Sequence, residues 1–411
     1  MKILLAITGS IASYKSIELA RLFIKDGHDV KCIISKGAED FIKPELLSYL
    51  GAISVYKSGD DFNLSKYDNN TSNVLHIDLT NWCDLYVIAP LSANTMAKLA
   101  NGQCDDLLSS VFLATTDKPI VIAPAMNTKM YHNPITQKNI EILKELENVS
   151  YVAPESGLLA CGDVGIGKFP KIEKMKALIE VTPLQRNITP QNILISTGAS
   201  ISPIDPVRYL TNASSGKTGL MLAKEFLRNG DFVTVVSGQV IPEELEYLVG
   251  FSNFQLIQST TTSKLKDIII NEFKLCDIYI SAAAFCDIEF KVKNKKIKKD
   301  QFTGSLEYTS APDILTEVLQ LKRVNQKVIG FAAETSADEA TFLKKWEQKK
   351  VDILIGNIVE SGLGDKEALG FGTNSGDYFF IQDGQVVETG HLTKRQLAKK
   401  IIRISNEHYS N

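Results

Sequence analysis

MKILLAITGSIASYKSIELARLFIKDGHDVKCIIS, residues 1–35, predicts a strand, a helix and a second strand in close succession. The apolar run at 2–7 and the run DVKCIIS at 29–35 are β-type, and between them apolar residues repeat at the spacing of one helix face. Residues on this face include Ile17, Ala20 and Ile24. Gly27 stands where a helix end favours a left-handed residue. Such a unit is typical of a parallel α/β sheet.

Further apolar runs extend this pattern along the chain. DLYVIAP (84–90) and KPIVIAP (118–124) are apolar almost throughout, which predicts strands covered on both faces of a parallel sheet. The pattern then restarts with the strand NILISTGAS (192–200), a helix, and the strand DFVTVVSG (231–238). The second half of the chain therefore repeats the architecture of the first.

Length and composition agree with two globular domains. A chain of 411 residues favours two domains of about 200 residues each. The polar segment at 180–192, with its two prolines, predicts the linker. We therefore predict an α/β protein of two doubly wound, Rossmann-like three-layer domains, residues 1–188 and 189–411.

The charge balance and the apolar runs exclude several classes of function. A net charge of −3 gives no global electrostatic case for a nucleic-acid or membrane partner. The N-terminal apolar run is too short for a signal peptide, and no later run approaches the ~20 residues of a membrane helix. The six cysteines show no metal-ligand spacing, and no metal ligand is assigned. We expect a soluble cytoplasmic protein with reduced cysteines.

The stretch TNASSGKTGLML (211–222) ends like a phosphate-binding P-loop. A P-loop needs a glycine five residues before its Gly-Lys pair, where Thr211 stands instead. The tripeptide Gly216-Lys217-Thr218 therefore does not make this chain a P-loop ATPase or GTPase.

Polar loops follow the predicted strands of the first half. TGSIASYK (8–15), the SANT tetrapeptide at 92–95 and APAMNTKMYHNP (123–134) all lie at strand carboxyl ends, which converge in a doubly wound sheet. Gly9 permits close approach of a ligand, and the following helix N-terminus favours a phosphate. The first loop lacks G-x-G-x-x-G, which disfavours a nicotinamide dinucleotide.

Together with HIDL (76–79) and ACGDVGIGK (160–168), these loops resemble the flavin-dependent cysteine decarboxylase family. The resemblance implies that FMN is held by Gly9, Ser10, Ile11, Ser35, Ser92, Ala93, Asn94 and Thr95. It also implies three catalytic residues: His76 in the active site, Asn127 on the substrate carboxylate, and Cys161 as a proton donor. Without this resemblance, a lone histidine at the start of a strand is usually a solvated or capping residue. A cysteine in a glycine-containing loop is usually an inert small side chain. Tyr131, where the family usually has tryptophan, and Cys104, where it has alanine, depart from the pattern.

SPIDPVRYLTNASSGKTG (202–219) resembles the phosphopantothenate–cysteine ligase domain. The resemblance implies that Arg208 binds the phosphopantothenate and that Asn212 is catalytic. The lysine run KVKNKKIKKD (291–300) then resembles a flexible flap over a nucleotide triphosphate, with Lys296 catalytic. A lysine run alone also suits a solvated loop or a nucleic-acid contact, but no aromatic residue interleaves with it to stack on bases.

Further ligase motifs imply a CTP site. The residues assigned to it are Ser281, Ala282, Ala283, Asp287, Pro312, Asp313, Ile314, Leu315, Phe331, Lys345 and Lys349. Phe285 and Ile288 depart from the family pattern beside the base pocket.

In this order the two halves resemble the bifunctional coenzyme A biosynthesis family. That resemblance implies FMN, Mg²⁺ with CTP, 4′-phosphopantothenate, cysteine and 4′-phosphopantothenoylcysteine as cofactors and substrates. It also implies a homo-oligomer with trimeric flavodomains and dimeric ligase domains. The rival hypothesis, a flavin-binding regulatory module fused to an inactive ligase fold, predicts loss of catalytic residues. His76, Asn127, Cys161 and Lys296 are all present.

Overall fold

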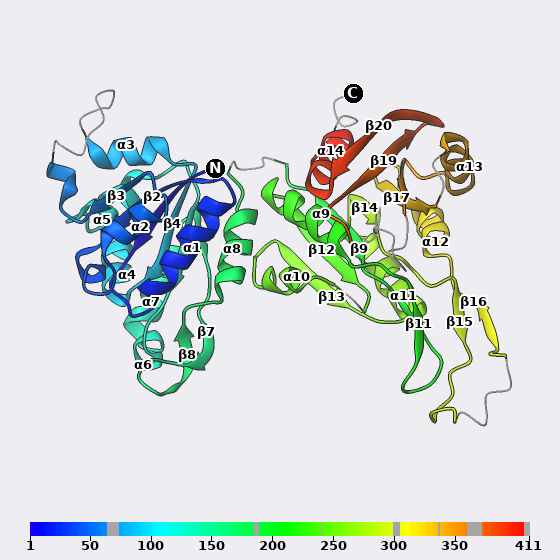
Figure 1. Cartoon of the computed structure of the whole chain (residues 1–411), viewed down its shortest axis with the longest axis horizontal. Coiled ribbons are helices and arrows are strands. Elements are labelled where there is room, and N and C mark those ends of the chain that lie inside the picture. The colour runs from blue at the N-terminus through cyan, green and yellow to red at the C-terminus, as the bar shows by residue number, and fades with distance from the viewer. Residues whose placement is uncertain are drawn as a thin grey trace. The chain divides into compact units, whose positions relative to one another are not determined.

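The computed structural model describes residues 1–63, 74–184, 189–239, 241–298, 305–335, 338–359 and 372–406. The chain divides into two compact units, Met1–Arg186 (unit 1) and Asn187–Asn411 (unit 2) (Figure 1). The domain boundary predicted at residue 188 falls in 185–188, which lies outside the described residues, as do the last two residues of the lysine run.

Unit 1 is built on a parallel sheet that has six strands within the described residues, in the order β3-β2-β1-β4-β5-β6. The strands are β1 (Lys2–Ile7), β2 (Asp29–Ile34), β3 (Ser54–Lys57), β4 (Leu85–Leu91), β5 (Ile120–Pro124) and β6 (Val149–Tyr151). The order reverses between β1 and β4, and doubly wound sheets bind ligands beyond the carboxyl ends of the strands at such a point.

Helices cover both faces of this sheet (Figure 1). They are α1 (Ser13–Lys25), α2 (Pro44–Tyr49), α3 (Leu75–Trp82), α4 (Ala93–Ala100), α5 (Leu107–Ala114), α6 (Thr128–Tyr131), α7 (Pro134–Lys144) and α8 (Ile172–Val181). Short 3-10 helices, η1 (Lys36–Ala38) and η2 (Asp60–Phe62), and the hairpin β7 (Glu155–Leu158) and β8 (Val164–Lys168) complete the unit. Helix α1 packs against α8, whereas α3, α4, α5 and α7 share a core with Leu4 and Ala6 of β1. Because β1 is covered on both sides, Ile3 to Ile7 are fully buried, which explains its unbroken apolar run.

His76 lies in the first turn of α3, not at the start of a strand as expected from the sequence. Leu75 and Leu79, four residues apart, are both buried on the core face of this helix. Asp61 accepts a hydrogen bond from the backbone N–H of His76 at 3.2 Å and so supplies an acceptor to the helix start. This partner comes from a distant segment, so the local pattern did not reveal it.

Unit 2 repeats the topology of unit 1 and extends it. Within the described ranges its main sheet has eight strands, in the order β13-β12-β9-β14-β17-β18-β19-β20. These are β9 (Asn192–Thr197), β12 (Phe232–Ser237), β13 (Phe254–Gln258), β14 (Ile278–Ser281), β17 (Lys327–Glu334), β18 (Ile353–Ile358), β19 (Ser375–Gln382) and β20 (Gln385–Thr393). The first six in spatial order pair in parallel with the same reversal, next to β9, whereas β19 and β20 add an antiparallel edge.

The helices of unit 2 again form two layers. They are α9 (Lys217–Arg228), α10 (Glu243–Tyr247), α11 (Thr262–Phe273), α12 (Ile314–Leu321), α13 (Glu339–Lys349) and α14 (Lys394–Asn406). Helix α9 packs against α14, whereas α11, α12 and α13 share the core that contains Tyr279 and Val328. The doubly wound three-layer fold predicted from the sequence is confirmed in both units.

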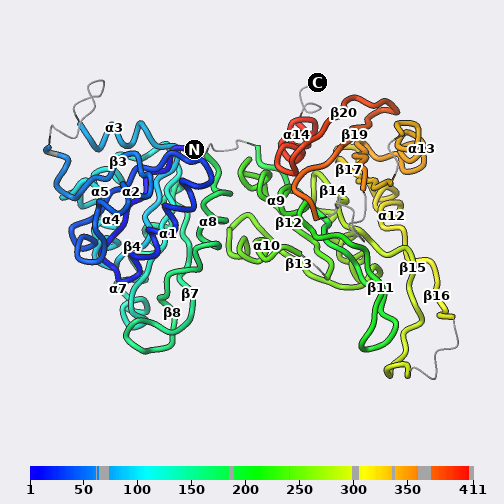
Figure 2. The backbone as a smooth tube through the Cα atoms, viewed as in Figure 1, coloured from blue at the N-terminus to red at the C-terminus, as the bar shows by residue number. Residues whose placement is uncertain are grey.

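Two short ribbons lie side by side at one end of unit 2 (Figure 2). They are β10 (Ile201–Pro203) with β11 (Tyr209–Thr211), and β15 (Ile288–Phe290) with β16 (Tyr308–Ser310). The first carries the IDPVR motif in its turn, and the second leads into the lysine run.

None of the described helices is long and apolar enough to cross a membrane. Nor does the described part of the chain hold a cluster of three or more His, Cys, Asp or Glu residues that could bind a metal ion.

Candidate active sites

Unit 1 has a cavity of about 630 Å³ at the carboxyl ends of β1, β4 and β5, where the strand order reverses. Loops that the sequence predicted to converge all contribute to its lining. The predicted residues that line it are Gly9, Ser10, Ile11, Ser92, Ala93, Asn94, Asn127 and Cys161. The β7/β8 hairpin closes one side with Leu158 and Lys168. The tertiary structure therefore brings most of the predicted flavin and catalytic residues of this unit together.

Groups beside this cavity suit a phosphate. Among the described residues, the buried hydroxyl of Ser35 has no hydrogen-bond partner, and the N-terminus of α1 has no side-chain cap. The backbone around Gly9 is also tightly packed, because a Cβ added there would lie 2.9 Å from the carbonyl carbon of Gly37. An unpartnered buried hydroxyl and the positive end of a helix both favour an anion such as a phosphate.

The side chains of Ser92 and Thr95 are hydrogen-bonded to each other at the start of α4. The Ser92 hydroxyl accepts from the Thr95 N–H at 3.3 Å and lies 3.1 Å from the Thr95 hydroxyl. Thr95 and Ser35 are buried and are not among the described residues that line the cavity. Ser92 caps α4 and so fixes the 92–94 backbone against the cavity.

Asn127 and Cys161 are in direct contact. The Asn127 amide donates from Nδ2 to the Cys161 sulfur at 3.2 Å, and its Oδ1 accepts from the Lys129 N–H at 2.8 Å. The second bond caps α6 and fixes the amide. The thiol of Cys161 is exposed and also donates to Asp163 at 3.5 Å. An amide and an accessible thiol thus face the same cavity.

The sequence did not single out two lysines of this cavity, Lys15 and Lys168. Burial lowers the pKa of Lys15, with the nearby Lys168 charge as the second cause. Lys15 also donates to the Phe169 carbonyl at 3.2 Å. Lys15 lies within the quoted loop motif, but only the fold shows that it faces the cavity rather than solvent.

His76 is not among the described residues that line this cavity. Its Nδ1 lies 2.9 Å and 3.1 Å from the two carboxylate oxygens of Asp61. Within the described part of one chain, His76 therefore stays apart from Asn127 and Cys161.

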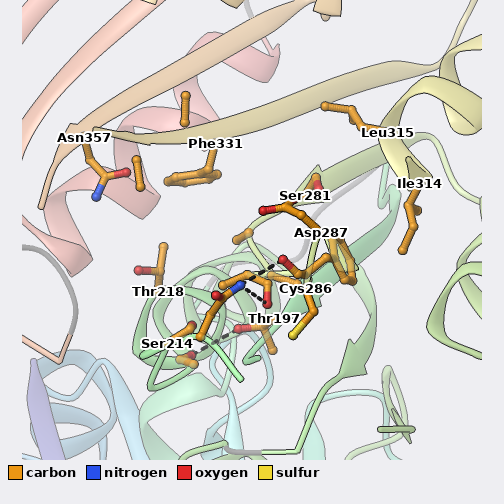
Figure 3. A pocket seen from close by; sticks show the side chains of 18 of the residues that line it. Thr197, Ser214, Thr218, Ser281, Cys286, Asp287, Ile314, Leu315, Phe331 and Asn357 are labelled. Atoms are coloured by element: carbon orange, nitrogen blue, oxygen red, sulfur yellow. Dashed lines mark hydrogen bonds between the residues drawn. The ribbon is translucent and has the colours of Figure 1, made fainter. Parts of the chain in front are cut away.

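Unit 2 has a second cavity of about 630 Å³ at the carboxyl ends of β9, β14, β17 and β18 (Figure 3). The predicted residues that line it are Asn212, Ser281, Ala282, Ala283, Asp287, Pro312, Asp313, Ile314, Leu315, Phe331, Lys345 and Lys349. The Gly-Lys-Thr segment at the start of α9 faces the same space. Gly219 lets α9 approach β9, because a Cβ there would lie 2.1 Å from the Thr197 hydroxyl oxygen.

Hydrogen bonds order one side of this second cavity. The Asn212 amide donates from Nδ2 to the carbonyls of Phe285 at 2.8 Å and Ala284 at 3.3 Å. Elsewhere in the lining, Lys349 pairs with Asp313 at 2.6 Å, and Lys345 pairs with Glu334. Asn212 thus ties the 211–216 loop to the segment that follows β14.

Two further lysines of the second cavity were missed as site residues. Lys217 donates to the Gly372 carbonyl at 2.6 Å, and Lys394, the first residue of α14, is buried. Burial lowers the pKa of Lys394 to about 8, with the Lys217 charge as a lesser cause. Lys394 lies far along the chain from the ligase motifs, so no sequence signal placed it here. The described lining of this cavity includes four lysines, which suits a polyphosphate.

Arg208 and Lys296 are not among the described residues that line the second cavity. Lys296 is exposed and lines a separate space of about 600 Å³ with other residues of the lysine run. Arg208 pairs with Asp205 and donates to the Ile297 carbonyl. The structure therefore separates these two residues from Asn212 within the chain.

Comparisons with known proteins cover both units. The family described as Flavoprotein matches residues 1–182, and the family described as DNA/pantothenate metabolism flavoprotein C-terminal domain matches residues 188–407. The Coenzyme A biosynthesis bifunctional protein CoaBC of Bacillus subtilis (strain 168) is 33% identical over 406 residues, which are 98% of this chain and 95% of the relative. The chain belongs to the CoaBC family of coenzyme A biosynthesis bifunctional proteins.

A second CoaBC protein, from Haemophilus influenzae (strain ATCC 51907 / DSM 11121 / KW20 / Rd), is 35% identical over 366 residues, 88% of this chain and 87% of the relative. A solved structure of a PPC decarboxylase mutant complexed with pantothenoylaminoethenethiol is 34% identical and covers 44% of this chain and 96% of that chain, with a TM-score of 0.39. The family membership confirms the resemblance found in the sequence: the chain is a bifunctional enzyme of coenzyme A biosynthesis with a flavoprotein half and a ligase half.

Proposed function

We propose that the two halves catalyse consecutive steps. The ligase domain, residues 189–411, activates 4′-phosphopantothenate with CTP as an acyl-cytidylate and couples it to cysteine. The decarboxylase domain, residues 1–188, converts the resulting 4′-phosphopantothenoylcysteine to 4′-phosphopantetheine. The observation that carries the decarboxylase half is the contact of the Asn127 amide with the Cys161 thiol in the unit 1 cavity. The ligase half is supported by the unit 2 cavity, where Asn212 and several lysines line one space.

The direct test supplies purified full-length protein with 4′-phosphopantothenate, cysteine and CTP. We expect pyrophosphate, CO₂ and 4′-phosphopantetheine, identified by mass. Accumulation of 4′-phosphopantothenoylcysteine would contradict the decarboxylase assignment, and recovery of unchanged 4′-phosphopantothenate would contradict the ligase assignment.

FMN is the cofactor that we assign to the unit 1 cavity. The loops at 9–11 and 92–95, with the Ser35 hydroxyl and the N-terminus of α1, would hold its phosphate, ribityl chain and ring. Bound there, FMN supplies oxidation of the cysteinyl thiol before loss of CO₂ and returns the electrons afterwards.

The side chains of the first site then have separate roles. Asn127 holds the substrate carboxylate, and Cys161 delivers a proton from its sulfur. His76 acts in the same reaction from a neighbouring subunit, because in its own chain it lies away from the described lining. In a trimer of flavodomains and a dimer of ligase domains, a neighbouring subunit could contribute residues to each site. We assign the enzyme to the cytoplasm, where reducing conditions keep Cys161 a thiol.

Replacing Gly9 with alanine should weaken FMN binding about 10-fold, the effect of about 1.4 kcal/mol of forced backbone movement. The new Cβ would meet backbone atoms of Gly37, and the 35–38 segment would have to shift. FMN titration of the apoprotein, followed by flavin fluorescence, measures the change. Gly59→Ala is the matched control, because a Cβ there meets nothing within 4 Å. Equal FMN affinity of the Gly9 and Gly59 variants would contradict the assignment.

CTP is the nucleotide that we assign to the unit 2 cavity. Lys217, Lys345, Lys349 and Lys394 would meet the triphosphate, and backbone groups of 281–283 would meet the cytosine. The family resemblance implies that Arg208 binds 4′-phosphopantothenate. In this structure its guanidinium instead donates to the Asp205 carboxylate and to the Ile297 carbonyl. We expect Mg²⁺ to arrive with CTP, since Mg²⁺ usually binds through substrate phosphates.

CTP affinity should fall as the pH rises above about 8. The pKa of Lys394 is lowered to about 8 by burial and by Lys217, and a triphosphate beside the ammonium would raise it again. The protonated form therefore binds CTP better: affinity is level below pH 8 and declines above it, with proton uptake on binding near pH 8. Calorimetry in two buffers of different ionisation enthalpy measures this uptake. The Lys394→Gln variant should lose it, and equal uptake in both proteins would rule out Lys394 as its source.

A further inference from the structure

The IDPVR turn and the lysine run, two motifs far apart in the sequence, are joined by one buried carboxylate. The Asp205 side chain has no exposed surface. Its Oδ1 accepts from the N–H groups of Val207 and Arg208, both at 2.9 Å, which closes the turn between β10 and β11. This half of the carboxylate serves the local turn alone.

The other oxygen of Asp205 serves the lysine run. Oδ2 accepts from the N–H of Ile297 at 3.1 Å and from Nε and Nη2 of Arg208 at 3.0 Å and 2.5 Å. Nη2 of Arg208 also donates to the Ile297 carbonyl at 2.8 Å. Both backbone polar groups of Ile297, the residue next to Lys296, are therefore held by the Asp205–Arg208 pair.

A third bond holds the other side of Lys296. The N–H of Lys293 donates to the Ile204 carbonyl at 3.0 Å. The backbone that carries Lys296 is thus fixed to the 204–208 turn at both ends (Figure 2 shows the two ribbons side by side). The flexible flap predicted from the sequence is therefore attached to the rest of unit 2 through the residues on either side of Lys296.

We propose that Asp205 and Arg208 are positioning residues for Lys296 in acyl-cytidylate formation. The proposal rests on the proposed ligase activity and on the catalytic role of Lys296 that the family resemblance implies. A lysine side chain is long and flexible, so its ammonium is placed well only if its backbone is fixed. Arg208 then acts through Lys296 rather than as a ligand of 4′-phosphopantothenate.

The charge state of the Asp205–Arg208 pair suits this positioning role. Bonds from Arg208 hold the pKa of the Asp205 carboxyl well below its usual range, against the opposing effect of burial. The carboxylate therefore stays ionised at any working pH, and a planar guanidinium can reach Oδ2 and the Ile297 carbonyl at once. A lysine at position 208 has a single nitrogen and could not reproduce that fork.

The two oxygens of Asp205 can be separated by mutation. In Asp205→Asn the amide oxygen can still accept from Val207 and Arg208 N–H, but the NH₂ cannot accept from Ile297 or the guanidinium. We expect Asp205→Asn and Arg208→Lys to slow pyrophosphate release about 10- to 100-fold, the cost of a misplaced catalytic group. The KM for CTP should change less than about 3-fold, because Asp205 and Arg208 lie outside the described lining of the nucleotide cavity.

The experiment is a double-mutant cycle on full-length protein. Single-turnover pyrophosphate release is measured with 4′-phosphopantothenate and Mg-CTP, without cysteine, in the wild type and in the Lys296→Gln background. In that background Asp205→Asn and Arg208→Lys should have less than about 3-fold further effect, because the residue they position is already gone. Decarboxylation of supplied 4′-phosphopantothenoylcysteine reports folding of the other half of the same chain, and thermal unfolding reports unit 2.

Asp231→Asn is the matched control. Asp231 is also buried and accepts from a backbone N–H, that of Gln191 at 3.1 Å, but it stands before β12, at the end of the sheet away from the cavity. Any effect of this variant should be the same with and without Lys296. Equal effects of Asp205→Asn in both backgrounds, or none in the wild type, would overturn the positioning role alone. Normal pyrophosphate release by Lys296→Gln would overturn the catalytic role of Lys296 and this proposal with it.

Discussion

Lys296→Gln should slow release of pyrophosphate from CTP by about 10²–10³-fold, the usual cost of removing one charge-stabilising group from a transition state. Negative charge builds on the departing pyrophosphate, and a lysine ammonium that meets it lowers the barrier. Glutamine keeps much of the length and polarity of the side chain but has no charge. The measurement is single-turnover pyrophosphate release without cysteine, so that only the first half-reaction is observed.

Two variants make this result specific. Lys291→Gln removes a charge from the same run, where the exposed ammonium faces Glu307 at 3.8 Å, and should leave the rate within about 3-fold. Asn212→Asp should instead release pyrophosphate and then react slowly with cysteine. There the new carboxylate would oppose the Phe285 and Ala284 carbonyls that the amide now holds, and would disturb the site where the acyl-cytidylate is presented. If the Lys291 and Lys296 variants are equally slow, the run acts only through its total charge.

Cys161→Ser should abolish formation of 4′-phosphopantetheine while CO₂ release continues. A serine hydroxyl is a far weaker acid than a thiol, so it should fail as the proton donor of the final step. The decarboxylated substrate should then accumulate in a form two hydrogen atoms lighter than the normal product, which mass spectrometry resolves. His76→Asn should stop the reaction before CO₂ is lost.

The contacts of Cys161 make this a test of chemistry rather than of packing. The thiol is exposed and bonded to Asn127 and Asp163, and a hydroxyl can accept and donate in the same places. Cys104→Ser, at another exposed cysteine of unit 1, should retain full activity. A normal yield of 4′-phosphopantetheine from Cys161→Ser would remove Cys161 from the mechanism.

The sequence by itself determined the sheet architecture and much of each site. Hydrophobic periodicity is local, so the β1–α1–β2 unit and its repeat from β9 onward were readable without a structure. Loops at the carboxyl ends of parallel strands must converge at one edge. For that reason the loops that carry Gly9, Ser92 and Asn127 meet in one cavity, whereas Cys161 reaches it from the turn of the β7/β8 hairpin.

Only the tertiary structure decided which partners the polar side chains take. Asp61 accepts from the His76 N–H at the start of α3, the Ile297 carbonyl engages Arg208, and α14 brings Lys394 into the nucleotide cavity. Each of these is a contact between segments far apart in the chain. A local pattern records which face of an element is apolar, because that depends on neighbouring residues alone. It does not indicate which distant carboxylate or carbonyl a charged group will contact, because strand order and helix packing determine that partner.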